Sequence, residues 1–201
     1  QAFRLIRAII PQAAERNGKS IFIVGDAHQR IHRRRAIMSA CGINIRGHSR
    51  RLRLNYRTTQ EIGAWAISVV KGVPVDNLDG GTDTLQDHIC LTHGAEPELV
   101  EYLTEAEELS GIAAWIHSLS ADEVQLSDIA VLCARRADVD RVRDALRMSG
   151  INTMDLPPRG EDEIRQTGVR ITSLQRSTGL DFLAVAIPFL SATSFPPGAA
   201  L

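Results

Sequence analysis

Two short segments of the chain combine residue types that suit phosphate and base chemistry. The first, Gly25-Asp26-Ala27-His28-Gln29-Arg30-Ile31-His32, places a carboxylate and an amide just after an apolar run. The second, Leu54-Asn55-Tyr56-Arg57-Thr58-Thr59, places an aromatic ring beside a guanidinium. Open α/β sheets hold ligands just beyond the ends of their strands, and a guanidinium matches the geometry of phosphate oxygens. The two segments therefore predict a nucleotide or nucleic-acid site.

Charge is strongly segregated along the chain, although the net charge is only -1. Residues 27–60 contain no Asp or Glu but many Arg and three His, whereas residues 72–134 contain no Lys or Arg and many carboxylates. A basic stretch of this kind favours nucleic acid, because it releases counterions from phosphates. Alternatively, it is a solvated face paired with the acidic helix of the same fold.

Apolar periodicity predicts helices alternating with strands. Helices are expected over residues 3–10, from Thr59 to Lys71, from Thr104 to Leu119 and over 137–148. In the second of these, Ile62, Trp65, Ala66 and Val69 share one face. Strands are expected over residues 21–24, 43–45, 52–54, 89–92, 98–103, 129–133, 169–172 and 184–188. Strands separated by helices of this length predict parallel βαβ units, hence an α/β fold with a doubly wound sheet.

Other classes of protein are disfavoured by what the sequence lacks. No apolar run approaches the ~20 residues of a membrane span, so a soluble, cytoplasmic protein is expected. Cys41, Cys90 and Cys133 are far apart, which predicts reduced, mostly buried thiols and no zinc ribbon. Gly18-Lys19-Ser20 ends like a phosphate-binding loop, but Ala13 stands where that motif needs its first glycine.

The order of these segments resembles the UvrD/Rep-type superfamily-1 DNA helicases. Residues 25–32 resemble motif III of that family and residues 54–59 resemble motif IV. The third segment, similar to motif V, is Val169-Arg170-Ile171-Thr172-Ser173-Leu174-Gln175-Arg176-Ser177-Thr178-Gly179-Leu180-Asp181-Phe182. Residues 126–133, followed by a helix to Gly150-Ile151, resemble the strand-helix unit that precedes the accessory insertion of the family. The resemblance implies a three-layer α/β/α RecA-like fold with a parallel sheet, of the kind found in P-loop NTPases.

The resemblance also implies roles for the residues that match it. Gln29 would sense the γ-phosphate of ATP and Arg57 would reach it across an interdomain cleft, which makes these two the catalytic candidates. The other nucleotide-binding candidates are Asp26, Tyr56, which would stack on adenine, and Gly179 and Asp181. The DNA-binding candidates are Arg30, His32, Arg34 and Gln175. The alternative is that Tyr56 packs under a helix and the arginines are solvated.

The motif V segment departs from the family pattern at two positions. Gln175 stands in place of a His and Thr178 in place of a Lys. Glutamine keeps hydrogen-bonding capacity, but threonine does not keep the charge. If the resemblance holds, these departures imply either a divergent branch of the family or a motor with weakened coupling.

The chain has no P-loop, no Asp-Glu pair ahead of the segment that resembles motif III, and no motif VI. Residues 1–54 are therefore expected to be the C-terminal part of a first RecA-like domain, and residues 55–201 an incomplete second one. About 115 residues separate motifs IV and V, which leaves no room for a large accessory domain. This chain alone is expected not to hydrolyse ATP.

The leading hypothesis is that the chain is part of an ATP-dependent DNA helicase or translocase. Its partners would be single-stranded DNA, ATP with Mg²⁺ in the longer parent protein, and the parent's N-terminal motor domain; no metal site in this chain and no membrane partner is expected. The alternatives are a degenerate, non-catalytic binding module and the motor part of a helicase-nuclease.

Overall fold

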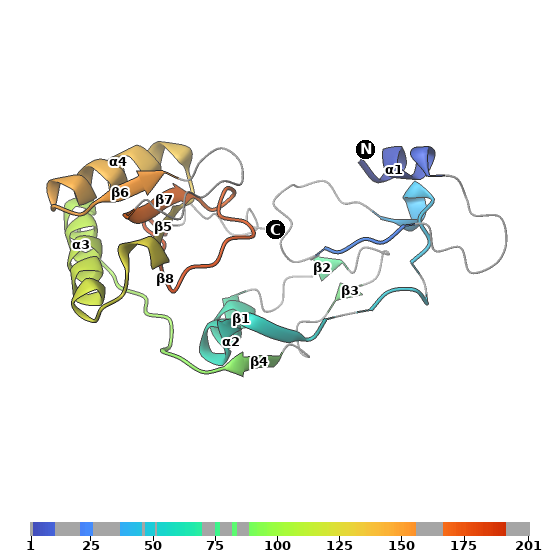
Figure 1. Cartoon of the computed structure of the whole chain (residues 1–201), viewed down its shortest axis with the longest axis horizontal. Coiled ribbons are helices and arrows are strands. Elements are labelled where there is room, and N and C mark those ends of the chain that lie inside the picture. Colours follow the sequence, from blue (N-terminus) through green and yellow to red (C-terminus); the bar gives the residue numbers. More distant parts are fainter. Residues whose placement is uncertain are drawn as a thin grey trace. The chain divides into compact units, whose positions relative to one another are not determined.

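The computed structural model of the chain (Figure 1) describes residues 2–10, 21–25, 37–45, 47–50, 52–69, 75–76, 82–83, 89–155 and 167–191. The chain divides into two compact units between Glu98 and Leu99. The boundary expected between the two motor domains, at residues 54 and 55, falls within a strand of unit 1. That assignment to motor domains stays a prediction.

Unit 1 contains short helices and two small two-stranded sheets. Its elements are α1 (Ala2–Ile9), the 3-10 turn η1 (Ser39–Cys41), β1 (Leu54–Thr59), α2 (Gln60–Val69), β2 (Val75–Asp76), β3 (Thr82–Asp83) and β4 (Ile89–Thr92). β1 and β4 are parallel, and β2 and β3 are antiparallel. The helix expected over 3–10 and the strand expected over 89–92 are confirmed.

Three of the predicted strands are wrong. Residues 21–25, 43–45 and 93–103 have irregular backbone, and β1 covers only the last residue of the strand expected over 52–54. Phe22 is 91% exposed and Val24 75%, so the apolar run at 21–24 is not a core strand. An apolar run becomes a strand only where a neighbouring strand completes its hydrogen bonds, and a local pattern does not report that neighbour.

Helix α2 begins where the sequence predicts, because the Thr59 hydroxyl accepts a hydrogen bond from the Ile62 amide at 3.3 Å. Its apolar face is not buried, however: Ile62, Trp65 and Val69 are 42%, 45% and 62% exposed. The helix instead approaches β4 through Gly63, where an added Cβ would lie 2.9 Å from the Cys90 Sγ. A glycine permits this close approach, whereas the larger apolar residues do not.

Unit 2 is a parallel sheet with two packed helices. Its elements are α3 (Glu105–Ala121), the 3-10 turn η2 (Leu126–Asp128), β5 (Ile129–Cys133), α4 (Arg136–Met148), β6 (Thr153–Asp155), β7 (Val169–Ser173) and β8 (Ala184–Ala186). The strand order is β6-β7-β5-β8, and every pair is parallel. The strands expected near 129–133, 169–172 and 184–188 are confirmed, while β6 was not expected.

Local signals account for the ends of the two helices of unit 2. At the start of α3, Thr104 and Glu107 form a capping box in which each side chain accepts from the backbone of the other. After α4, Gly150 adopts a φ of 76°, and the Ile151 amide returns to the Leu146 carbonyl at 3.0 Å. Glycine takes this left-handed conformation with the least strain, so Gly150 ends α4 favourably, whereas Glu123 takes the same position after α3 with a φ of 65°.

The core of unit 2 forms between the sheet and helices α3 and α4. It includes Ile112 and Ile116 of α3, Val142 and Leu146 of α4, and the alternate residues of β5 and β7. Every residue of β5 and β7 is buried, so both faces at the centre of the sheet are covered, as parallel strands require. The chain is thus a mixed α/β protein with parallel sheets, and a three-layer arrangement remains a prediction.

Candidate nucleotide and nucleic-acid site

The predicted site residues fall into three groups. Tyr56 and Arg57 belong to unit 1, and Gln175, Gly179 and Asp181 belong to unit 2. The remaining candidates lie outside the described residues: Asp26, Gln29, Arg30, His32 and Arg34. The described candidates therefore form two separate groups, one in each unit, and each group is described by itself.

The segment that carries Tyr56 and Arg57 is a bulge in β1. Asn55 pairs with Cys90 and Thr59 pairs with Thr92, so three residues of β1 stand opposite the single residue Leu91 of β4. A bulge bends its strand and redirects the side chains in it. The segment that resembles motif IV is therefore not a regular strand but a local distortion of one.

The side chain of Asn55 organises this bulge. Its Oδ1 accepts hydrogen bonds from the amides of Arg57 at 2.9 Å and Thr58 at 3.3 Å, and its Nδ2 donates to the Thr58 Oγ1 at 2.6 Å. Asparagine suits this position because its amide can satisfy the backbone groups that the interrupted ladder leaves free. The Asn of the Asn-Tyr-Arg sequence thus has a structural role that sequence reasoning missed.

The bulge presents two successive side chains to solvent. Tyr56 is 72% exposed, and the neighbouring Arg57 is also exposed. In a regular strand, successive side chains point to opposite faces, so one of the two would face the helix that covers the sheet. The alternative in which Tyr56 packs under a helix is therefore wrong in this structure. An exposed ring beside an exposed guanidinium is chemically able to stack on a base and to bind a phosphate.

Hydrogen bonds join the start of α2 to the two residues that follow β4. The Glu61 carboxylate lies 2.9 Å from the His93 Nδ1 and accepts from the Gly94 amide at 2.9 Å. These hydrogen bonds, first that of His93 and then that of Gly94, lower the pKa of Glu61 to about 2. Sequence reasoning missed this contact, although a carboxylate in the first turn of a capped helix was a signal for a local role.

The second surface is the connection that follows β7 in unit 2. The Leu174 amide donates to the Cys133 carbonyl at 3.0 Å, which keeps the end of β7 beside the end of β5. The chain then turns, because the amides of Arg176 and Ser177 both return to the Ser173 carbonyl, at 2.9 and 3.2 Å. Leu183 rejoins the sheet by donating to the Asp128 carbonyl at 2.9 Å.

This connection exposes the three described candidates of the segment that resembles motif V. Gln175, Gly179 and Asp181 are all exposed, and Gly179 adopts a φ of 91°, which only glycine accepts without strain. The Thr178 hydroxyl donates to the Gln175 carbonyl at 3.1 Å, so it is engaged within the turn. The turn lies at the carboxyl end of adjacent parallel strands, where open α/β sheets bind ligands.

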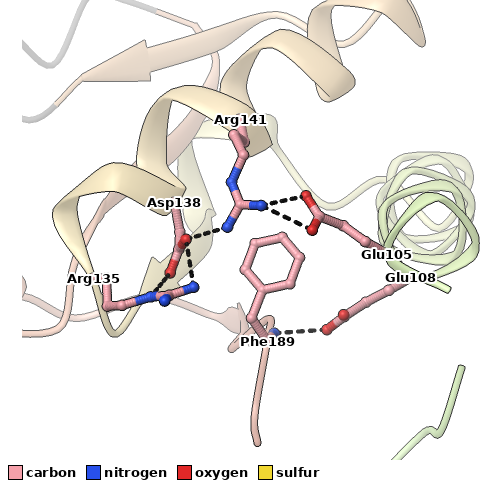
Figure 2. Close-up of polar contacts among 6 residues, drawn as sticks. All are labelled: Glu105, Glu108, Arg135, Asp138, Arg141 and Phe189. Atoms are coloured by element: carbon pink, nitrogen blue, oxygen red, sulfur yellow. Dashed lines mark hydrogen bonds and ion pairs between the residues drawn. The ribbon is translucent and has the colours of Figure 1, made fainter. Parts of the chain in front are cut away.

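A network of charged residues joins helix α4 to its surroundings (Figure 2). The Asp138 carboxylate accepts from the Arg135 Nε at 2.9 Å and Nη2 at 3.1 Å, and from the Arg141 Nη2. Arg141 also donates to both Glu105 oxygens at 2.7 and 2.8 Å, and its guanidinium lies 5.0 Å from the centre of the Phe189 ring. The network joins α3, α4 and the segment after β8.

Asp138 is the buried member of the network, at 1% exposed. Burial by itself raises its pKa, but the hydrogen bonds and charges of Arg135 and Arg141 outweigh that cost, so the pKa of Asp138 is lowered. Burial and the nearby Asp138 carboxylate raise the pKa of Cys133 to about 11. Cys41, Cys90 and Cys133 are all free thiols, as predicted, but only Cys133 is buried.

Two kinds of feature are absent from the part of the chain that the structure describes. No group of three or more His, Cys, Asp or Glu side chains there is arranged to hold a metal ion. None of the described helices combines the length and the apolar character that a membrane crossing requires.

No protein-family model, curated protein or solved structure matches this chain.

Proposed function

We propose that this chain is part of an ATP-dependent DNA helicase or translocase motor. In the parent protein, Arg57 and Gln29 would contact the γ-phosphate, and Tyr56 would stack on the adenine. Asp26, Gly179 and Asp181 would line the nucleotide, and Arg30, His32, Arg34 and Gln175 would contact single-stranded DNA. The parent would use a three-layer RecA-like sheet in each motor domain, with the first ending near Leu54.

The observation that carries this function is the bulge at Asn55 to Thr58. It presents Tyr56 and Arg57 together on the surface, held by three hydrogen bonds of the Asn55 side chain. In phosphoryl transfer, an arginine finger contacts the γ-phosphate of a nucleotide that is bound by another surface. Its side chain must therefore be exposed, and its backbone must be held in place. The exposed turn at Gln175 to Asp181 adds support, since it follows a buried parallel strand as a ligand-binding loop would.

Nucleotide chemistry would follow from domain closure. A γ-phosphate held by the first motor domain would attract Arg57, and loss of that phosphate on hydrolysis would release it. A cycle of this kind moves one domain relative to the other along the DNA strand. The basic residues of the 27–60 stretch would supply affinity for the DNA backbone without regard to sequence.

The decisive experiment is Arg57→Ala in the parent protein, measured by ATP hydrolysis at saturating single-stranded DNA. We expect kcat to fall on the order of a thousand-fold, the usual contribution of an arginine finger. Arg50→Ala is the matched control. Arg50 is an exposed arginine of the same basic stretch, but it has no expected role at the γ-phosphate of ATP. Arg50→Ala should weaken DNA binding and leave kcat near that of the parent. Near-normal kcat in Arg57→Ala would overturn the proposed function.

A non-catalytic binding module is the second candidate, and one observation favours it. The Thr178 hydroxyl, at the position where the family has a Lys, is used inside its own turn and brings no charge to a ligand. A module of this kind would bind single-stranded DNA with a strong dependence on salt but without any dependence on ATP. In that case Arg57→Ala and Arg50→Ala would weaken DNA binding to similar extents.

A further inference from the structure

The bulge that carries Arg57 is held from both sides by β4. On its N-terminal side, Leu54 and Asn55 pair with Ile89 and Cys90 in the parallel ladder. On its C-terminal side the ladder resumes only at Thr59 and Thr92. Side-chain contacts therefore have to hold the strands together where the backbone pairing is interrupted.

Thr58, within the bulge, lies 3.8 Å from the Cys90 Sγ through its Oγ1, and further contacts follow at and beyond Thr58, of which the strongest involve Glu61. The Thr92 hydroxyl donates to the Thr58 carbonyl at a long 3.4 Å. Gly94 packs so closely on Thr59 that an added Cβ would lie 2.8 Å from its Cγ2. The Glu61 carboxylate binds both the His93 ring and the Gly94 amide at 2.9 Å, and charged acceptors form the stronger hydrogen bonds.

We infer that Glu61 is a positioning residue, which fixes the orientation of Arg57 by holding the end of β4 against the start of α2. This inference rests on the proposed function of Arg57. Glu61 itself touches no nucleotide in this scheme; its oxygens are occupied by His93 and Gly94. Without the Glu61 oxygens, His93 and Gly94 lose their hydrogen bonds to the start of α2, and the C-terminal side of the bulge keeps only the Thr59–Thr92 pairing and the long Thr92–Thr58 hydrogen bond.

The consequence for catalysis is specific. An arginine that contacts the γ-phosphate contributes most in the transition state, so misplacing it lowers kcat more than it raises KM for ATP. Displacements on the order of 1 Å cost about 100-fold in rate. Because Arg57 remains present in a Glu61 variant, the loss should be smaller than in Arg57→Ala.

The test uses the parent protein with Glu61→Ala, Glu61→Gln, Arg57→Ala and the double variant Glu61→Ala/Arg57→Ala. Glutamine keeps one acceptor oxygen and is expected to restore most of the activity. We expect Glu61→Ala to lower kcat about 10- to 100-fold with KM for ATP changed by less than about threefold. The double variant should be no slower than Arg57→Ala, because a residue that acts through Arg57 has no effect in its absence.

Hydrogen exchange supplies a readout that does not depend on turnover. The amides of Arg57 and Thr58 donate to Asn55, and both should exchange faster in Glu61→Ala than in the parent. If Glu61→Ala does not fold, as judged by circular dichroism, His93→Ala removes one of the two donors and is expected to show a smaller fall in kcat.

The outcomes separate the inference from the proposed function. Normal kcat in Glu61→Ala together with a large loss in Arg57→Ala overturns the inference alone. A double variant much slower than Arg57→Ala also overturns it, because Glu61 would then act independently of Arg57. Normal kcat in Arg57→Ala overturns the proposed function, and the inference with it.

Discussion

The two carboxylates Asp138 and Asp140 on helix α4 allow a direct test of how burial changes the value of an ion pair. Both are bonded to an arginine three residues away, but Asp138 is 2% exposed at its side chain and Asp140 is 69% exposed. Replacing a partner in a buried pair costs about 3–5 kcal/mol, because an uncompensated charge remains. In this network the side chains of Arg135 and Arg141 are 58% and 44% exposed, so water can solvate them.

We therefore expect Asp138→Ala to lower the free energy of unfolding by about 2–3 kcal/mol, the value of hydrogen bonds to a charged group. Asp140→Ala should cost at most about 1 kcal/mol, as exposed pairs do, and Arg143 keeps its contact with Asp155. A unit of this size is typically stable by about 5–15 kcal/mol, so both variants should remain folded.

The assay is urea unfolding of the full chain in a Trp65→Phe background, followed by the fluorescence of Trp115. Trp115 packs against the core of unit 2 and is then the chain's single tryptophan, so its signal reports that unit. At pH 7, Asp138→Ala should show a larger loss in the free energy of unfolding than Asp140→Ala. Because the pKa of Asp138 is lowered by folding, this stability should be lost as the pH falls below about 4. Equal losses in the two variants, within about 0.5 kcal/mol, would refute the role of burial.

Two further predictions concern the titratable groups of the described residues. The pKa of Glu61 is about 2 in the folded chain, against an ordinary value of 4.5. Its contribution to the free energy of unfolding is therefore complete above pH 4.5 and lost as the pH falls toward 2. Glu61→Gln in a Trp115→Phe background should remove that pH dependence from Trp65 fluorescence; an unchanged acid transition would contradict it. Native chain treated with a thiol-reactive disulfide at pH 8 should label Cys41 and Cys90, and Cys133 only after denaturation, because burial raises the pKa of Cys133 to about 11. Three rapidly labelled thiols in the native chain would show that Cys133 is not protected.

The parts of unit 2 that were predicted correctly are those with strong local signals. Strand β5 is a continuous apolar run, and α3 begins at a capping box that can be read from Thr104 and Glu107 alone. The errors fall where a segment depends on a distant neighbour. Residues 21–24 have the composition of a strand but no described strand partner, and β6 is a strand of three residues that forms because β7 lies beside it.

The candidate site shows the same division. The residue types of Tyr56 and Arg57 led to the expectation of a surface for phosphate and base chemistry, which stays a prediction; the structure shows that both side chains are exposed. Neither the bulge nor the exposure of both side chains follows from the sequence, because the register of β1 is set by β4, more than thirty residues away in the chain. The contact of Glu61 with His93, 32 residues apart, is invisible for the same reason.

The sequence by itself determined the α/β class, the starts of α2 and α3, the end of α4 and the side-chain chemistry that the motifs offer, because propensity, capping and side-chain type are properties of neighbouring residues. The tertiary structure decided which apolar runs became strands, which helix face was covered and how Arg57 is presented. Those depend on packing and pairing between distant segments: Gly63 brings α2 onto β4, and the interrupted ladder places Arg57 at the surface.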